Sequence, residues 1–176
     1  LKAPSTAGNY NLIWDIVQEN VGWFSGQGAP LLYVPGITVA ASKQYDVQWV
    51  SHSTPAKLKP GEIVNVPIVL TNIGMLTWPK GGANPVSISY HWYDSNWQAV
   101  AWGVGLRSQL LNDVATGQMI NINAALKAPS LEGSYNLVWD IVQEGVTWFS
   151  FNGTTTLDIP VTVTAPVYNV QWGSHN

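Results

Sequence analysis

Two carboxylates that stand four residues apart are the first candidates for chemistry. Asp140 and Glu144 have this spacing, and Asp15 and Glu19 repeat it near the start of the chain. The carboxylates of a glycosidase lie about 5–5.5 Å apart in retaining enzymes and about 6.5–9.5 Å apart in inverting ones. Four residues along a strand span about 13 Å. Unless a bulge intervenes, the spacing excludes such a pair, and we expect an outward-facing Asp140 and a Glu144 that caps a turn.

The histidines and the lack of cysteine limit the other chemistries. The chain contains His52, His91 and His175 and no cysteine. The histidines lack the spacing of a metal-binding motif, and without cysteine there is no thiol catalysis, zinc–thiolate site or disulfide. His91, Tyr93 and Asp94 resemble part of a catalytic triad, but no serine stands in a nucleophile-elbow motif. We therefore predict a protein that is not an enzyme and has no metal or other cofactor.

Four side chains are better candidates for contact with a ligand or partner. His91, Tyr93, Trp97 and Trp102 lie on or near the predicted outward face of two adjacent strands. Exposed aromatic rings can stack on sugar rings or on a partner protein. They can equally cover the edge of the fold or contact a neighbouring unit, and the sequence leaves both interpretations open.

Two further features have simpler structural explanations. Arg107 is the only arginine of the chain, and we expect it to form an ion pair with Asp94 or Asp113. The tripeptide Asn152-Gly153-Thr154 fits the N-glycosylation pattern, and we interpret it as a turn.

An internal repeat is the strongest feature of the sequence. Residues 1–25 recur as residues 126–150 with 19 of 25 positions identical, and YDVQWVSH (45–52) recurs as YNVQWGSH (168–175). The offsets of 125 and 123 residues give a unit of about 124 residues. This period is too long for a solenoid repeat and matches one small domain.

The repeat predicts the division of the chain. We expect the C-terminal part of one unit in residues 1–42, a complete unit in residues 44–165 and the first strand of the next unit in residues 167–176. Tyr168, Val170 and Trp172 are the candidate inter-unit strand. The chain therefore reads as part of a longer tandem array, which we prefer to strand donation between chains.

Hydrophobic periodicity predicts the fold of one unit. Apolar residues alternate with polar ones through seven to nine short segments, and turn signals recur about every ten residues. This pattern is typical of an all-β, immunoglobulin-like antiparallel β-sandwich. Trp92 falls on the inward face of the third strand, and Tyr135 stands after Gly133 where a tyrosine corner is expected. We expect Trp139 and Trp148 to fill the volume between the sheets.

Composition excludes two classes of partner. Charged residues make up 10% of the chain, the formal net charge is −3, and there are only seven lysines and arginines. A nucleic-acid-binding domain needs a basic surface. No apolar run approaches the roughly 18 residues that span a bilayer, so we predict no nucleic-acid partner and no membrane span in this sequence.

Several motifs together resemble a known family. They are Asn72-x-Gly74 followed by Trp78-Pro79, Gly133-x-Tyr135-x-x-x-Trp139, and Trp148-Phe149. This pattern resembles the four-tryptophan Ig-like domain named from an autophagy cargo receptor. The run Tyr90–Asp94 and Gly105-x-Arg107 are closest to its bacterial branch. The resemblance implies a non-catalytic accessory or spacer module with a core signature of Trp78, Trp92, Tyr135, Trp139 and Trp148.

These observations predict an extracellular or cell-surface structural repeat. Units that pack head to tail would form a stalk, fibre or filament array, with neighbouring copies of the same repeat as partners. The alternative is a carbohydrate-binding or adhesive module of a secreted enzyme, whose partner would be a cell-surface glycan.

Overall fold

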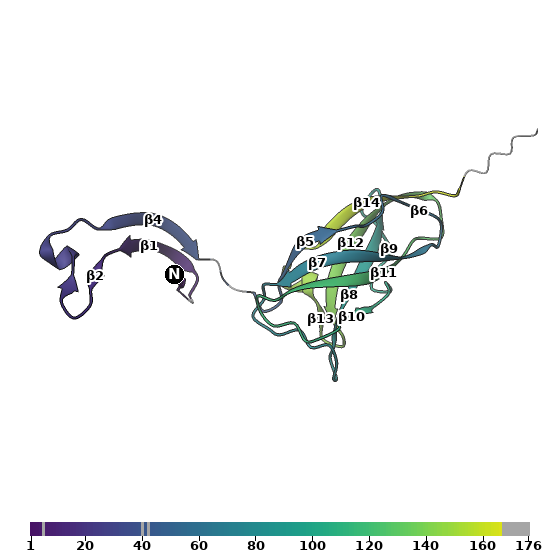
Figure 1. Ribbon diagram of the computed structural model, residues 1–176. Helices are drawn as coiled ribbons and strands as arrows, with labels where there is room; N and C mark the ends of the chain where they lie inside the picture. Colours follow the sequence, from purple (N-terminus) through teal and green to yellow (C-terminus); the bar gives the residue numbers. More distant parts are fainter. Residues whose placement is uncertain (5, 40, 42, 167–176) are drawn as a thin grey trace, which may run out of the picture. The chain divides into compact units, whose positions relative to one another are not determined.

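The computed structural model describes residues 1–4, 6–39, 41 and 43–166 and divides the chain into two compact units, Leu1–Ser42 and Lys43–Asn176 (Figure 1). Each unit is described by itself. The predicted inter-unit strand with Tyr168, Val170 and Trp172 lies outside the described residues. No helix in the described part of the chain is long and apolar enough to cross a membrane.

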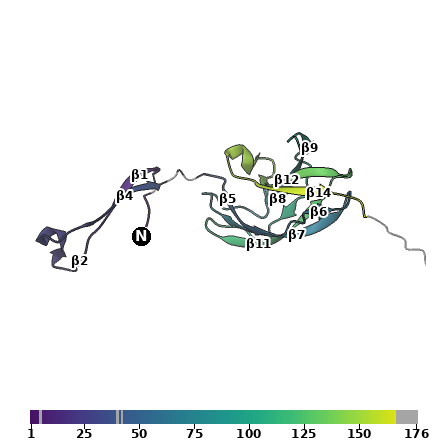
Figure 2. The same cartoon turned by 90° about the horizontal axis from the view of Figure 1, so that it is seen from above.

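The second unit is a sandwich of two β-sheets. One sheet has the strand order β11 (Met119–Lys127), β7 (Ile63–Asn72), β5 (Val47–His52). The main path of the other is β10 (Ser108–Gln109), β8 (Val86–Asp94), β12 (Gly133–Gln143), β14 (Leu157–Val163), β6 (Lys57–Leu58). Beside this path, β9 (Ala99–Ala101) pairs with β8, and β13 (Thr147–Trp148) pairs with β12. Within the described part of this unit, only β6 and β14 pair in parallel, and Figure 2 shows the two layers in a view turned by 90°. The predicted all-β sandwich is confirmed.

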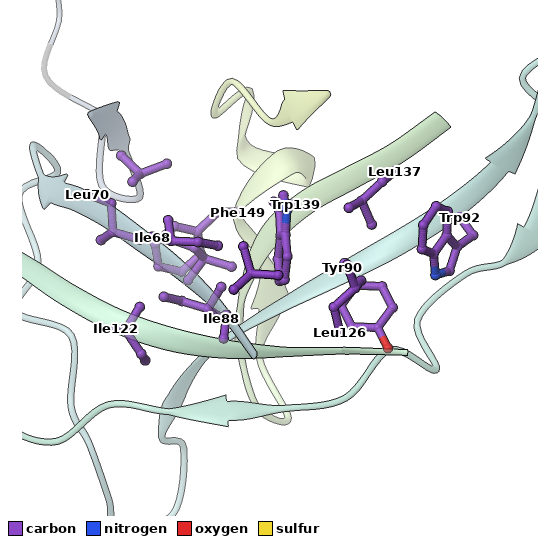
Figure 3. Packing of buried hydrophobic residues seen from close by; sticks show 14 of the residues in the cluster. Ile68, Leu70, Ile88, Tyr90, Trp92, Ile122, Leu126, Leu137, Trp139 and Phe149 are labelled. Atoms are coloured by element: carbon purple, nitrogen blue, oxygen red, sulfur yellow. The ribbon is translucent and has the colours of Figure 1, made fainter. Parts of the chain in front are cut away.

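The core lies between the two sheets and is dominated by the central strands β8 and β12. Side chains alternate between the two faces of a strand. Tyr90 and Trp92 of β8 therefore point inward together with Leu137 and Trp139 of β12 (Figure 3). The rings of Tyr90 and Trp139 meet edge to face with their centroids 5.5 Å apart. Such a contact adds about 0.5–1.5 kcal/mol to the burial of the rings.

The tyrosine corner expected at Tyr135 is present. Tyr135 Oη donates a hydrogen bond to the carbonyl oxygen of Leu131 at 3.0 Å, and its ring packs edge to face on Trp92. Trp92 is buried, and its Nε1 donates to the carbonyl oxygen of Lys127 at 2.9 Å. The expected inward position of Trp92 is therefore confirmed.

The tryptophans of the core signature divide between two faces. Trp78 and Trp139 lie in the core, where Trp78 packs against Phe149. The expectation that Trp148 fills the volume between the sheets is wrong. Trp148 pairs with Val142 across β12 and β13, and paired residues project to the same side of a sheet. Because Ile141 points into the core, Val142 and Trp148 point away from it.

A buried asparagine holds the start of the second unit. Asn72 Nδ2 donates to the carbonyl oxygens of Leu76 and Val114, and Asn72 Oδ1 accepts from the Gly74 amide. A Cβ on Gly74 would lie 2.7 Å from the carbonyl oxygen of Gln44 and 2.8 Å from the Asp46 amide nitrogen. The Asn72-x-Gly74 motif is therefore needed for a close backbone contact.

The first unit consists mainly of a β-hairpin. Its long strands are β1 (Gly8–Trp14) and β4 (Leu32–Val39), and the tip of the hairpin contains β2 (Val17–Gln18), β3 (Gly22–Trp23) and the short 3₁₀ helix η1 (Ser25–Gln27). Tyr10 Oη donates to the carbonyl oxygen of Thr6 at 2.8 Å, as Tyr135 does to Leu131. The repeated sequence thus forms the same tyrosine contact in both units.

The close approach at Gly74 predicts a steric effect. In Gly74→Ala the new methyl group meets backbone atoms that cannot move without disturbing the unit, so we expect the free energy of unfolding to fall by about 1–3 kcal/mol. Gly81→Ala is the control, because a Cβ there meets nothing within 4 Å. Chemical denaturation compares the two, and equal midpoints would contradict the steric explanation.

Candidate functional site

The outer face of the larger sheet carries the candidate site. His91 projects from β8 on the side opposite to Tyr90 and Trp92, and Val138 and Asp140 project from β12 on the side opposite to Trp139. Two segments beyond these strands add the remaining rings. We call the four contacting rings the outer aromatic cluster, which consists of His91, Trp102, Trp148 and Phe151.

His91 lies beneath the other rings of the cluster. Trp102 stacks on it with ring centroids 4.7 Å apart and an angle of 7° between the planes, and Trp148 lies at 4.4 Å. His91 is only 2% exposed. His91 projects from the outer face, as expected, but it lies beneath the other rings, whereas the rings above it are the ones that reach the surface. Trp97 and Trp102 are exposed and Tyr93 is half-buried.

Both ring nitrogens of His91 are occupied. The Gly103 amide donates to His91 Nδ1 at 3.1 Å. Nδ1 therefore carries no proton, and the imidazole proton on Nε2 points to Asp140 Oδ2 at 3.3 Å. His91 thus links the segment that carries Trp102 to strand β12.

Asp140 is buried and fully hydrogen-bonded. It accepts from Ser150 Oγ at 2.5 Å, from the Ser150 amide at 3.3 Å and from the Ile141 amide at 2.7 Å. Asp140 points away from the core, as expected. It is not exposed to solvent, because Ser150 and His91 cover its carboxylate. Ser150 donates its proton to Asp140, whereas a nucleophilic serine would donate to a histidine.

The first unit repeats the carboxylate–serine contact. Asp15 Oδ1 accepts from the amides of Ile16 and Ser25, and Asp15 Oδ2 accepts from Ser25 Oγ. The Ser25 hydroxyl, helped by the two amides, holds the pKa of the Asp15 carboxyl below its usual range, although partial burial opposes this shift.

Arg107 braces the segment that carries Trp102. Its Nη1 donates to Ser89 Oγ and to the Gly105 carbonyl oxygen, both at 2.8 Å, and Nη2 donates to the Gly103 carbonyl oxygen at 3.2 Å. Its Nε donates to Glu144 Oε1 at 2.7 Å, and the guanidinium lies 4.8 Å from the Trp148 ring centroid.

The expected ion pairs of Arg107 are wrong. Asp94 accepts from the amides of Asn96 and Gln98 within its own turn, and Asp113 accepts from the Lys80 amide. Glu144, expected as a turn cap, is instead the carboxylate that pairs with Arg107.

Gly105 explains why this segment lies flat on the sheet. A Cβ at this position would be 2.4 Å from the carbonyl oxygen of Tyr90 and 2.9 Å from Ser89 Oγ. Gly105-x-Arg107 thus combines a close backbone approach with a side chain that secures it. The motif was visible in the sequence, but its contacts depend on strands that are distant along the chain.

A shallow hollow of about 410 Å³ lies beside the outer aromatic cluster. Two of the predicted residues, Tyr93 and Trp97, form a ring pair at 5.7 Å on this hollow, and Trp102 and Phe151 form a stacked pair at 5.4 Å. The other contributors come from the second half of the unit and were not predicted from the sequence; they are Val138, Ser150, Phe151, Thr156 and Asp158.

Two other features of the region bear on the sequence predictions. Asn152-Gly153-Thr154 forms the end of the 3₁₀ helix η2 (Phe149–Asn152) and the left-handed residue Gly153, so the predicted turn is confirmed. The hydroxyl of Thr154 is buried and donates to the Tyr45 carbonyl oxygen at 2.6 Å. Among the described residues, no group of three or more acidic or histidine side chains could hold a metal ion.

Comparisons with known proteins add little to this description. No family model matches the chain, and no curated protein matches it. Among solved structures, a family 123 glycoside hydrolase from Clostridium perfringens, studied for glycolipid glycan hydrolysis, matches with 14% identity and a TM-score of 0.29. The match covers 63% of this chain and 23% of that one.

The brace predicts local rather than global loosening when Arg107 is lost. In Arg107→Met the hydrogen bonds to Gly103 and Gly105 disappear, so we expect the Gly103 amide to exchange its hydrogen roughly ten-fold faster or more. Lys80→Met is the control, because Lys80 Nζ bonds the Leu111 carbonyl oxygen instead. Hydrogen exchange by NMR provides the measurement, and unchanged exchange at Gly103 would show that Arg107 is no brace.

The Asp15 contact predicts a measurable titration. Ser25→Ala removes the largest stabilising contact of the carboxylate, so the pKa of Asp15 should rise towards its usual value. In the unaltered chain the hydrogen bonds to the Asp15 carboxylate stabilise the folded state at pH values above the usual pKa. This contribution is lost as the pH falls through the lowered pKa of Asp15. Carboxyl ¹³C NMR gives the pKa, and Thr38→Val is the control in the same hairpin. An unchanged pKa of Asp15 in Ser25→Ala would contradict the assignment of Ser25 as the main cause of the lowered pKa.

Proposed function

We propose that this chain is a non-catalytic structural repeat of an extracellular or cell-surface protein, in which immunoglobulin-like units are joined directly into a stalk or filament array. The family we propose for it is the bacterial branch of the four-tryptophan Ig-like domains. The reactive side chains of the outer face support the non-catalytic role, because Asp140, His91 and Ser150 all bond one another or the backbone.

The uncovered face of the first unit is the observation that carries this proposal. Trp14 is 48% exposed, whereas its repeat equivalent Trp139 is fully buried. Trp23 is 57% exposed, whereas its equivalent Trp148 is 9% exposed. In the second unit Trp139 lies in the core between the sheets, and Trp148 is covered by His91, Trp102 and Arg107 on the outer face. The first unit has the equivalent side chains without comparable cover.

Short connections between units support a rod-like array. Strand β4 ends at Val39, and the second unit holds the chain from Lys43 onward. The carbonyl oxygens of Lys43 and Gln44 accept from the amides of Met75 and Leu76, and Lys43 Nζ donates to the Gly153 carbonyl oxygen. Only residues 40–42 lie between the end of β4 and Lys43, and a connection this short leaves little freedom between neighbouring units.

An extended chain tests the proposal. A copy of residues 43–125 placed ahead of Leu1 should complete the first unit, because residue 126 is the repeat equivalent of residue 1. We expect Trp14 and Trp23 to become protected from an aqueous fluorescence quencher. Small-angle scattering should show a particle longer by about one domain.

The control carries Ile68→Asp within the added copy, where a charge in the core prevents folding. If Trp14 and Trp23 remain equally accessible in both extended chains, the first unit is not part of a repeat. A compact particle that does not lengthen would contradict the rod.

A further inference from the structure

We propose that the hollow beside the outer aromatic cluster binds a neutral carbohydrate, with the apolar face of a sugar ring against its aromatic walls. This proposal is independent of the structural role, since a unit of an array can carry a ligand site on its outer face. Its residues come from β8, β12 and β14 and from the segments that follow β8 and β13.

The walls of the hollow are aromatic, and three of their four rings are exposed. Trp97 lies beside Tyr93, whereas Trp102 and Phe151 form the second ring pair, and all four rings line the same hollow. Its volume of about 410 Å³ lies within the range of small-molecule sites, which is about 300–1,000 Å³. Aromatic rings offer apolar faces to a ligand that also carries polar groups.

Trp97 is held in an unfavourable backbone conformation. Its φ of 60° lies in the left-handed region, which bulky side chains rarely occupy. Asp94 maintains the turn by accepting from the amides of Asn96 and Gln98, and its carbonyl oxygen accepts from the Trp97 amide. The Trp97 side chain is nevertheless 53% exposed, so the core does not explain this conformation. Strain of this kind concentrates at ligand-binding sites.

The polar groups of the hollow select the class of ligand. Asp158 Oδ1 accepts from Thr156 Oγ1 at 2.7 Å, and the exposed carboxylate retains capacity for hydroxyl donors. No lysine or arginine is among the described residues that line the hollow. A carboxylate without a cation disfavours phosphorylated or acidic sugars. It also disfavours a proline-rich peptide, whose backbone offers carbonyl acceptors but few donors.

The floor of the hollow is rigid before any ligand arrives. His91 is fixed between the Gly103 amide and Asp140, and Ser150 is fixed by Asp140. Ligand binding therefore orders few additional side chains, which reduces its entropic cost.

The repeated hairpin does not require the polar and aromatic rim. At the equivalent positions of the first unit, Gly26 stands for Phe151, Leu31 for Thr156 and Tyr33 for Asp158. The two hairpins nevertheless pair in the same register over Leu12–Trp14 and Leu137–Trp139, although β1 and β4 have a register shift between Tyr10 and Leu12 that β12 and β14 lack. The rim therefore belongs to the second unit and is not a property of the repeated hairpin sequence.

Titration of the full chain with neutral oligosaccharides tests the proposal. The probes are cello-, xylo-, manno- and N-acetylglucosamine oligomers, followed by NMR shifts of the tryptophan side-chain NH groups. We expect at least one series to bind saturably and to shift the Trp97 and Trp102 signals. Trp97→Ala and Asp158→Asn should each weaken binding at least ten-fold.

The variants are chosen so that folding remains intact. Trp97 and Asp158 are exposed, whereas loss of Trp102 would uncover His91. Trp23→Ala removes an exposed tryptophan of the first unit and is the matched control, which should bind as the unaltered chain does. Absence of saturable binding to all four series would overturn the proposal. So would equal binding by Trp97→Ala, or binding of a polyproline peptide in place of sugar.

Discussion

The antiparallel pairing of β8 with β12 organises both faces of the second unit. The register opposes Tyr90 to Trp139 and Trp92 to Leu137 on the inner side, and His91 to Val138 on the outer side. Because side chains alternate along both strands, one register places large rings in the core and also places His91 near Asp140. A slip of one residue would move each set to the wrong face, so the core and the outer aromatic cluster depend on the same backbone hydrogen bonds.

Polar contacts organise the outer face, whereas apolar packing organises the core. Arg107 joins Gly103, Gly105, Ser89 and Glu144, and Asp140 joins Ser150 to His91. Buried polar groups are costly when they lack partners. Here the partners are provided by two segments that lie on the outer face, one with Gly103 and Arg107 and the other with Ser150. The same hydrogen bonds therefore satisfy Asp140 and hold the aromatic side chains in place.

The sequence predicted the features that depend on local alternation. The inward Trp92 and Trp139, the tyrosine corner at Tyr135 and the sandwich itself follow from period-two patterns and turn residues. Trp148 was assigned to the wrong face because it follows a turn, and the pairing with Val142 decides its side. Glu144 as the partner of Arg107 was also missed, because 37 residues separate them and only the sheet register brings them together. Phe151 and Asp158 were missed for the same reason.

One repeated sequence exists here in two environments, because its side chains are buried in the second unit and exposed in the first. Hydrogen exchange of the full chain compares them directly, because Leu12, Trp14 and Ile16 are matched by Leu137, Trp139 and Ile141. The account predicts that the β12 amides exchange only through global unfolding and are protected by orders of magnitude more than their counterparts in the first unit. Comparable protection at the matched positions would contradict it, because the first unit would then be stable without covering strands.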